Sequence, residues 1–399
     1  MKVETFTEAI LIKMSDTGKV QRKFIISMCK LFLMLRGRYN FLNFARYGLL
    51  NELTYRLNFN KGFDFRQFNS QLITQYCSEK LVWVFDPSYL PKSGKHTPGV
   101  GYFWSGCAGA MKKGLEICGL AVADLVNHTA FHYHAGQTDA IKGEQNLLAF
   151  YAKLILRQVA ALKKVSKIVV VDAFFSKISF VNALCEHDLS VVSRMRSDSY
   201  LRYPFKGVQQ GGKGRPKEFD GKVDPRNVSN SHFKILRQTE TEVLYEGIAH
   251  IRALKRWCSV VIRQTLKDGK VHKAFIYFST DCKMTGQQVI ERYDIRFQIE
   301  FLYRDSKQFL GLTQCQSRQK KAIAFHVNMA LTVLNIAKAM HWISIPKTDR
   351  PPFSMADIKT QYINELILDR LICLYGKDPN VEKNNPDIRK LYDLGRIAA

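Results

Sequence analysis

The stretch KIVVVDAFFSKISFVNALCEHDLSVVSRMR, residues 167–196, decides the fold class. Its first part is an apolar, β-branched run that ends at Asp172, which predicts a strand. Helical spacing follows, and then a second β-rich run. A strand, a helix and a strand in close succession are typical of an α/β sheet core.

The same alternation extends toward the N-terminus. LVWVFD (81–86) is a β-rich run ending in Asp86, and residues 114–126 predict another strand. Residues 146–165 predict a helix. In α/β sheets, active groups gather at the carboxyl ends of strands. Asp86 and Asp172, each directly after an apolar run, are therefore candidate active-site carboxylates.

Residues 197–275 interrupt the alternation. A loop rich in glycine and cations leads into short β-type segments, which indicates an all-β insertion. Lys213 and Arg215 in the loop are candidates for following a DNA backbone. A solvated hairpin explains them about as well.

Residues 18–80 predict basic helices. Within them, residues 39–59 have the pattern of two short helices, with Arg46, Tyr55 and Arg56 expected on the exposed side. This pattern fits a helix-turn-helix-like DNA reader. A plain pair of antiparallel helices is the alternative.

The charge balance favours a polyanionic partner. The chain has 399 residues, and 60 Lys and Arg against 35 Asp and Glu leave a net charge of +25. Each phosphate neutralised by a cation releases a counterion, so nucleic acid is the leading candidate. We expect no membrane partner, because no apolar run approaches the ~18 residues that span a bilayer.

The expected compartment is the cytoplasm. The first twenty residues mix acidic side chains into the apolar ones and do not resemble a secretory signal. Nine scattered cysteines without a C-x-x-C pair predict reduced thiols rather than a zinc site.

A polar stripe is the sharpest functional signal. In YDIRFQIEFLYRDSK (293–307), Tyr293, Arg296, Glu300 and Lys307 fall on one side of a helix. The opposite, buried side is expected to carry Ile295, Ile299 and Leu302. The alternative is an amphipathic helix with ordinary intrahelical ion pairs.

These residues suit metal-dependent phosphodiester chemistry. Asp86, Asp172 and Glu300 would offer three carboxylates, the oxygen ligands that Mg²⁺ prefers. Two ions could activate the attacking oxygen and steady the leaving oxygen. Arg296 and Lys307 would then hold the phosphate chain, Arg296 through a bidentate fork.

The spacing Y-x2-R-x3-E-x6-K resembles the signature of the transposases of insertion-sequence family four. VVVDAFFSK, around Asp172, is similar to that family's second-Asp segment, and the resemblance extends over about residues 81–341. It implies an RNase H-like fold with Asp86, Asp172 and Glu300 as a catalytic DDE triad. It also implies two Mg²⁺ ions, for which Mn²⁺ is expected to substitute.

The resemblance further implies cut-and-paste transposition in a bacterial cytoplasm. A homodimer would bind double-stranded DNA at terminal inverted repeats, cleave it through a hairpin intermediate and join the ends to target DNA. An aromatic side chain would hold a flipped base, with Phe275 the nearest candidate by position and Trp257 another. Tyr293, Arg296 and Lys307 would contact the DNA close by.

The expected architecture is an α/β, RNase H-like core interrupted by the all-β insertion, with helical regions at both ends. Its parts are an N-terminal helical DNA-binding region (1–80), the first part of the core (81–196), the insertion (197–275), the second part of the core (276–345) and a C-terminal helical tail (346–399). Two alternatives remain for the function: an inactive, transposase-derived DNA-binding protein, and an RNase H-like nuclease without strand transfer.

Asp124 also follows a strand-like run and invites confusion with the triad. Its surroundings match nothing in the signature, so a structural role is expected. The histidines of DLVNHTAFHYH (124–134) lack the H-E-x-x-H spacing and are not expected to bind zinc.

Overall fold

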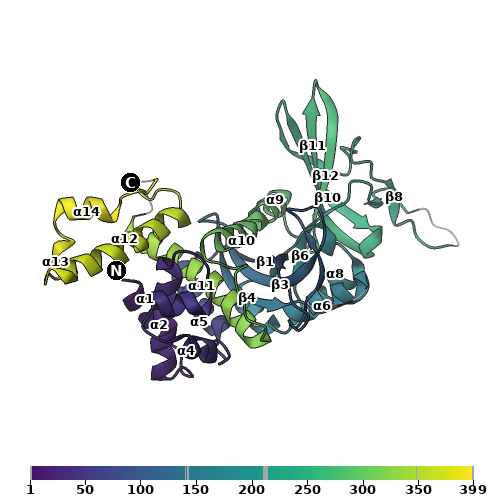
Figure 1. Ribbon diagram of the computed structural model, residues 1–399. Coiled ribbons are helices and arrows are strands. Elements are labelled where there is room, and N and C mark those ends of the chain that lie inside the picture. Colours follow the sequence, from purple (N-terminus) through teal and green to yellow (C-terminus); the bar gives the residue numbers. More distant parts are fainter. Residues whose placement is uncertain (1, 140, 142, 210–213, 347, 398–399) are drawn as a thin grey trace.

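A single large mixed sheet lies at the centre of the computed structural model (Figure 1), which describes residues 2–139, 141, 143–209, 214–346 and 348–397. Its 12 strands follow the order β2-β3-β1-β5-β6-β12-β11-β10-β7-β8, with β4 paired to β3 and β9 paired to β10. The predicted α/β class is therefore confirmed.

The inner strands combine antiparallel and parallel pairing. β1 (Leu81–Pro91) and β4 (Thr129–Gln137) both run antiparallel to β3 (Ala110–Asp124), whereas β5 (Ile168–Val170) runs parallel to β1 and to β6 (Ser190–Met195). β5 is short. It is apolar because it is covered on both faces. Helix α8 (Ile178–Cys185) joins β5 to β6, as the sequence predicts. The remaining inner strand is β2 (Gly101–Ser105), and the neighbouring helices are α6 (Glu144–Leu156) and α7 (Val159–Val165).

The outer strands continue the same sheet. β12 (Lys270–Ser279) pairs with β11 (Arg256–Lys267) from end to end, but with β6 only through Ile276–Ser279. The rest of the β11–β12 pair projects from the body in Figure 1. The segment 197–275 is thus all-β, but it extends the central sheet through β12. The strands beyond β11 are β10 (Glu242–Ile251), β7 (Leu201–Pro204), β8 (Phe219–Lys222) and β9 (Lys234–Gln238).

Helix α11 (Lys320–Ser344) is a long, largely buried core helix. By length and composition it could cross a bilayer, because an 18-residue window has a mean hydropathy of 1.3. The expectation that no such run exists is therefore wrong. However, 89% of that window is buried inside the protein, and a buried core helix meets the same criterion.

Two asparagines of α11 close the outer edge of β4. The Asn335 amide accepts from His132 N (2.8 Å) and donates to His132 O (2.7 Å). Two helical turns earlier, Asn328 makes the same pair of bonds with Ala135, both at 2.9 Å. Each amide copies the hydrogen-bonding pattern of a neighbouring strand. The main-chain groups of His132 and Ala135 are thereby satisfied without another strand.

The N-terminal helices pack against the sheet and α11. They are α1 (Val3–Leu11), α2 (Lys19–Met34), α3 (Phe41–Tyr47), α4 (Glu52–Asn58) and α5 (Phe65–Tyr76). The two short helices predicted in residues 39–59 are present, but the expected exposure of Tyr55 is wrong, since its exposed fraction is 0%. Its ring packs against Phe24 and Phe44, and a Cβ on Gly48 would lie 2.1 Å from its hydroxyl. Tyr55 therefore closes the hairpin rather than reading DNA.

The C-terminal helices lie against the N-terminal ones. They are α12 (Met355–Leu374), α13 (Pro379–Glu382) and α14 (Pro386–Tyr392). Lys359 of α12 anchors them, because its ammonium donates to Phe32 O (3.1 Å), Leu35 O (2.8 Å) and Tyr39 Oη (2.8 Å). Burial lowers the pKa of Lys359 to about 7, and the three bonds supply one acceptor for each ammonium hydrogen.

We expect Asn335→Ala to lower the free energy of unfolding by roughly 2–4 kcal/mol, because it leaves the buried His132 N–H and C=O without partners. Urea unfolding followed by circular dichroism measures the loss. The matched control is Asn230→Ala at an exposed position, which should change the value little. Equal stability of the two variants would contradict the edge-closing role of Asn335.

Candidate active site

The register of two parallel strands sets Asp86 and Asp172 side by side. Val84 of β1 lies opposite Val170 of β5, and each aspartate follows its valine by two residues. The expectation that Asp86 ends its strand is wrong, because β1 continues to Pro91. Residues 86–91 keep antiparallel partners on β3 after pairing with β5 has stopped. Asp86 therefore stands where the parallel part of β1 ends.

Asp172 lies where β5 ends. Its Oδ1 accepts from Phe174 N (3.0 Å) at the start of the short 3₁₀ turn η1 (Ala173–Phe175). Its main-chain oxygen accepts from Ser193 Oγ (2.8 Å) on β6. These two bonds fix the carboxylate at the carboxyl edge of the sheet.

Glu300 comes from the other side, on a nearly continuous helical segment. The segment consists of α9 (Gly286–Asp294), the 3₁₀ turn η3 (Ile295–Phe297) and α10 (Gln298–Phe309), and it begins with a capping box formed by Thr285 and Gln288. The predicted buried face is confirmed, since Ile295, Ile299 and Leu302 are at most 5% exposed. The polar side chains are thereby turned to the opposite side of the helix.

Arg296 links the helix to the aspartates. Its Nη2 donates to Glu300 Oε1 at 2.7 Å, and its side chain is only 14% exposed. Burial opposes the charged guanidinium, but Asp86, Tyr293 and Glu300 together raise the pKa of Arg296 above its ordinary value. The arginine is thus the local counter-charge of the carboxylates.

The carboxylates share one electrostatic field. The pKa of Asp86 is raised to about 7, chiefly by burial; Arg296 opposes the rise, while Asp172, Glu300 and the buried Glu116 add to it. Burial also raises the pKa of Asp172 against the effect of Arg296. Repulsion among buried like charges favours an added cation at this point.

The donor set suits a hard divalent cation, since three carboxylates offer oxygen ligands with room for substrate oxygens. In the described part of the chain, no group of three or more His, Cys, Asp or Glu side chains is arranged to hold a metal ion. Glu300 hydrogen bonds to Arg296 instead. Asp86, Asp172 and Glu300 are the residues that would hold the metal.

The other residues of the stripe lie around the carboxylates. Tyr293 packs its ring 4.9 Å from that of Tyr277, and the Arg296 guanidinium lies 6.0 Å from its centroid. Burial raises the pKa of the Tyr293 phenol. Lys307 is partly buried, and its ammonium donates to Ser88 Oγ at 2.8 Å. Burial lowers the pKa of Lys307.

Phe275 and Arg194 adjoin the same site. The guanidinium of Arg194 lies 5.8 Å from the centroid of the Phe275 ring, and its charge partly opposes the rise in pKa that burial causes at Asp172 and Tyr293. Sequence reasoning missed Arg194. The available signal was a cation near the end of the strand that follows Asp172.

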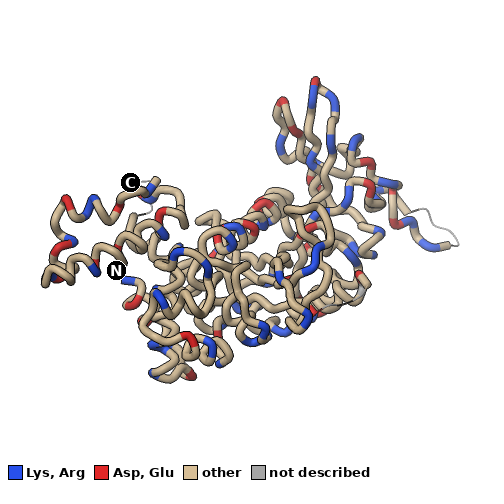
Figure 2. Tube along the Cα trace, in the orientation of Figure 1, with Lys and Arg blue, Asp and Glu red and all other residues tan. Residues whose placement is uncertain are grey.

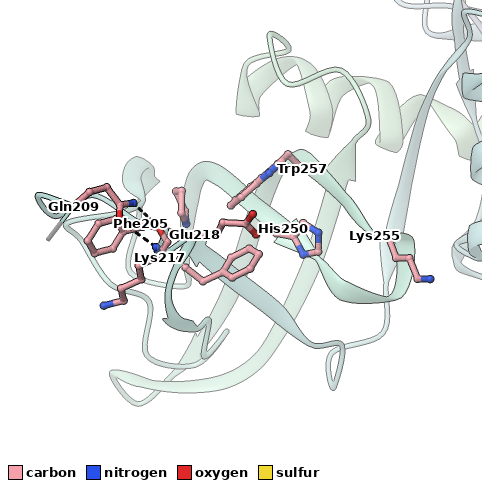
Figure 3. Close-up of a pocket in the computed structure, with 9 residues that line it drawn as sticks. Phe205, Gln209, Lys217, Glu218, His250, Lys255 and Trp257 are labelled. Atoms are coloured by element: carbon pink, nitrogen blue, oxygen red, sulfur yellow. Dashed lines mark hydrogen bonds between the residues drawn. The ribbon is translucent and has the colours of Figure 1, made fainter. Parts of the chain in front are cut away.

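Trp257 lies elsewhere, in a cavity of about 470 Å³ on the outer strands (Figure 3). It stacks on Phe219 with 5.6 Å between ring centroids and meets His250 edge to face at 5.3 Å. Phe275 is paired with Arg263, six residues from Trp257 along β11 and so about 20 Å away. The two aromatic candidates cannot hold the same base.

The remaining DNA-binding candidates are scattered cations. Arg46 is exposed on α3, Arg56 pairs with Glu52 (2.5 Å) and Arg215 pairs with Glu218 (2.6 Å), whereas Lys213 lies outside the described residues. Figure 2 shows cations on the N-terminal helices, the central body and the projecting strands. The positive charge is thus distributed rather than concentrated.

Two further carboxylates have clear structural partners. Glu116 is buried on β3 and accepts from Tyr151 Oη (2.6 Å) and Thr138 Oγ1 (2.8 Å); sequence reasoning missed its proximity to Asp86. Asp124 is fully buried and accepts from main-chain and side-chain donors of Ser78 and Asn127. These contacts agree with the structural role expected for Asp124.

Comparisons with known proteins point to the same chemistry. Residues 64–250 match a family model described as "DDE superfamily endonuclease". This range contains Asp86 and Asp172 and ends before Glu300. No curated protein matches the sequence. A solved structure of the piggyBac transposase synaptic complex with hairpin DNA is similar at 12% identity and a TM-score of 0.38, over 98% of this chain and 81% of that chain, a likeness too weak to support an inference.

We expect Arg296→Gln to raise the pKa of Asp86 further, because it removes the positive charge that opposes the effect of burial. Carboxyl ¹³C shifts of labelled aspartate, followed across pH, measure the change. Arg292→Gln is the matched control from the preceding turn, since Arg292 is not among the main charges that act on Asp86. An unchanged Asp86 titration in Arg296→Gln would contradict the geometry described above.

Proposed function

We propose that this chain is a metal-dependent DNA transposase whose DDE triad is Asp86, Asp172 and Glu300. The observation that carries the proposal is that Arg296 hydrogen bonds to Glu300 and acts electrostatically on both Asp86 and Asp172. The match of residues 64–250 to the DDE superfamily endonuclease model supports it. The strand order β4-β3-β1-β5-β6, with three antiparallel strands followed by two parallel ones, supports an RNase H-like core.

The triad would hold two Mg²⁺ ions, for which Mn²⁺ would substitute. When bound, the metal supplies Lewis acidity toward the scissile phosphodiester and lowers the pKa of an attacking water or 3′-hydroxyl. Arg296 binds a phosphate oxygen once its bond to Glu300 is released, and Lys307 supplies a point charge to the same strand. Tyr293 would donate a hydrogen bond from its phenol to a neighbouring phosphate.

The substrate we propose is double-stranded DNA with terminal inverted repeats, followed by target DNA. The net charge of +25 supports a DNA partner. Cleavage through a hairpin, a homodimer in the DNA complex and a bacterial cytoplasmic setting complete the proposal. Phe275 is the better candidate for holding a flipped base, because it adjoins Arg194, whose charge acts on Asp172, whereas Trp257 belongs to a separate cavity.

The decisive experiment is Mg²⁺-dependent cleavage of linear DNA that carries the gene's own flanking inverted repeats. We expect the wild type to produce nicks and hairpin ends. Glu300→Gln should cut at least about 10³-fold more slowly, because it removes a ligand charge while preserving shape. The matched control is Glu291→Gln, an exposed carboxylate of α9, which should cut like the wild type.

The products separate the rival functions. Joining of supplied 3′-hydroxyl ends to a second DNA identifies a transposase, whereas cleavage without joining identifies a nuclease. Binding of the DNA ends with no cleavage by the wild type would identify an inactive DNA-binding protein. Cleavage by Glu300→Gln at the wild-type rate would remove Glu300 from the triad.

A further inference from the structure

Helix α10 docks on β1 at two points beside the triad. Tyr303 Oη donates to the main-chain oxygen of Asp86 at 2.5 Å, and Lys307 Nζ donates to Ser88 Oγ at 2.8 Å. The donors are one helical turn apart, about 6 Å along the axis. The acceptors belong to alternate residues of a strand, about 6.6 Å apart. The helix and the strand therefore match in spacing.

The sheet has a place for the Tyr303 hydroxyl. Gly119 of β3 is the register partner of Asp86, and a Cβ on Gly119 would lie 2.1 Å from Tyr303 Oη and 3.0 Å from Cζ. A glycine inside a strand weakens the strand unless something approaches it closely. Here the approaching group is the phenol of Tyr303, which is only 5% exposed.

We propose that Tyr303 is a positioning residue that sets the distance between Glu300 and Asp86, with Gly119 as its receptor and Lys307 as the second point of attachment. Glu300 lies one turn before Tyr303 on α10, so a shift of the phenol moves the carboxylate with it. The role assigned to the two carboxylates rests on the proposed function. The docking itself does not.

Apolar packing alone would not fix this distance. Ile299 and Leu302 bury α10 against the sheet, but burial of apolar surface is non-directional and tolerates sliding. Hydrogen bonds to Asp86 O and Ser88 Oγ are directional and define one register. The helix-borne carboxylate is thereby tied to the main chain of the residue it works with.

A double-mutant cycle tests the docking without any activity. Gly119→Ala should destabilise the wild-type background strongly, because the new methyl meets the hydroxyl at 2.1 Å. In the Tyr303→Phe background the nearest atom is Cζ at 3.0 Å, so the same substitution should cost clearly less. The readout is the free energy of unfolding of the four proteins in urea. Equal costs in both backgrounds would overturn the proposal.

The Mg²⁺ dependence tests positioning. Removing a group that orients a metal ligand typically costs 10–100-fold in metal affinity, so we expect Tyr303→Phe to raise the Mg²⁺ concentration for half-maximal DNA cleavage roughly 10-fold. The rise in unfolding temperature with Mg²⁺ should shift in parallel. Tyr203→Phe, which removes another buried hydroxyl bonded to main chain (Ser229 N, 3.0 Å), is the control and should leave both curves in place.

The outcomes are distinct. If Tyr303→Phe lowers stability but leaves the Mg²⁺ dependence unchanged, Tyr303 has no positioning role and the proposal is rejected. If the wild type neither cuts DNA nor gains stability from Mg²⁺, the proposed function fails, and the docking of α10 is decided by the double-mutant cycle.

Discussion

The parallel pairing of β1 with β5 is the constraint on which the rest of the site depends. Only Trp83–Val169 and Val84–Val170 are paired, yet this short ladder fixes which residues stand level at the carboxyl edge. A slip of one residue would turn one aspartate to the other face of the sheet. Such a slip is costly, because Val169 and Val170 of β5 are both 0% exposed and would have to repack against different neighbours. Core packing therefore sets the geometry of two charged groups.

The neighbouring carboxylates need a positive charge close by, and the helical segment that carries Arg296 supplies it. Asp86 is held among other carboxylates and has a pKa near 7, so the fold gains stability from Arg296, which reaches Asp86 electrostatically and Glu300 by a hydrogen bond. The same residue carries a charge that suits a phosphate. An internal ion pair and a substrate contact thus compete for one guanidinium, and the entry of an anion or a cation at the site shifts that balance.

Local sequence patterns predict those structural features that depend on residues close together in the chain. The strand-helix-strand order of residues 167–196 and the buried face of the helix around Glu300 follow from periodicity, and both are present. The full length of β1 could not be predicted, because the part after Asp86 is held by distant residues of β3. The burial of Tyr55 and the contact of Tyr303 with Gly119 likewise arise only when separate segments meet. Arg194 carries no periodic signal, since its importance depends on the strand beside it.

Asn328 and Asn335 of α11 restrict strand pairing at the outer edge of β4. Because the amides of Asn328 and Asn335 occupy the main-chain groups of Ala135 and His132, these positions of β4 offer no free hydrogen-bonding groups to an incoming strand. The additional strands of this protein lie beyond β6, where β12 and its neighbours continue the sheet. Side chains of α11 thus cover part of the β4 edge, whereas the sheet is extended beyond β6 without interrupting the strands that carry Asp86 and Asp172.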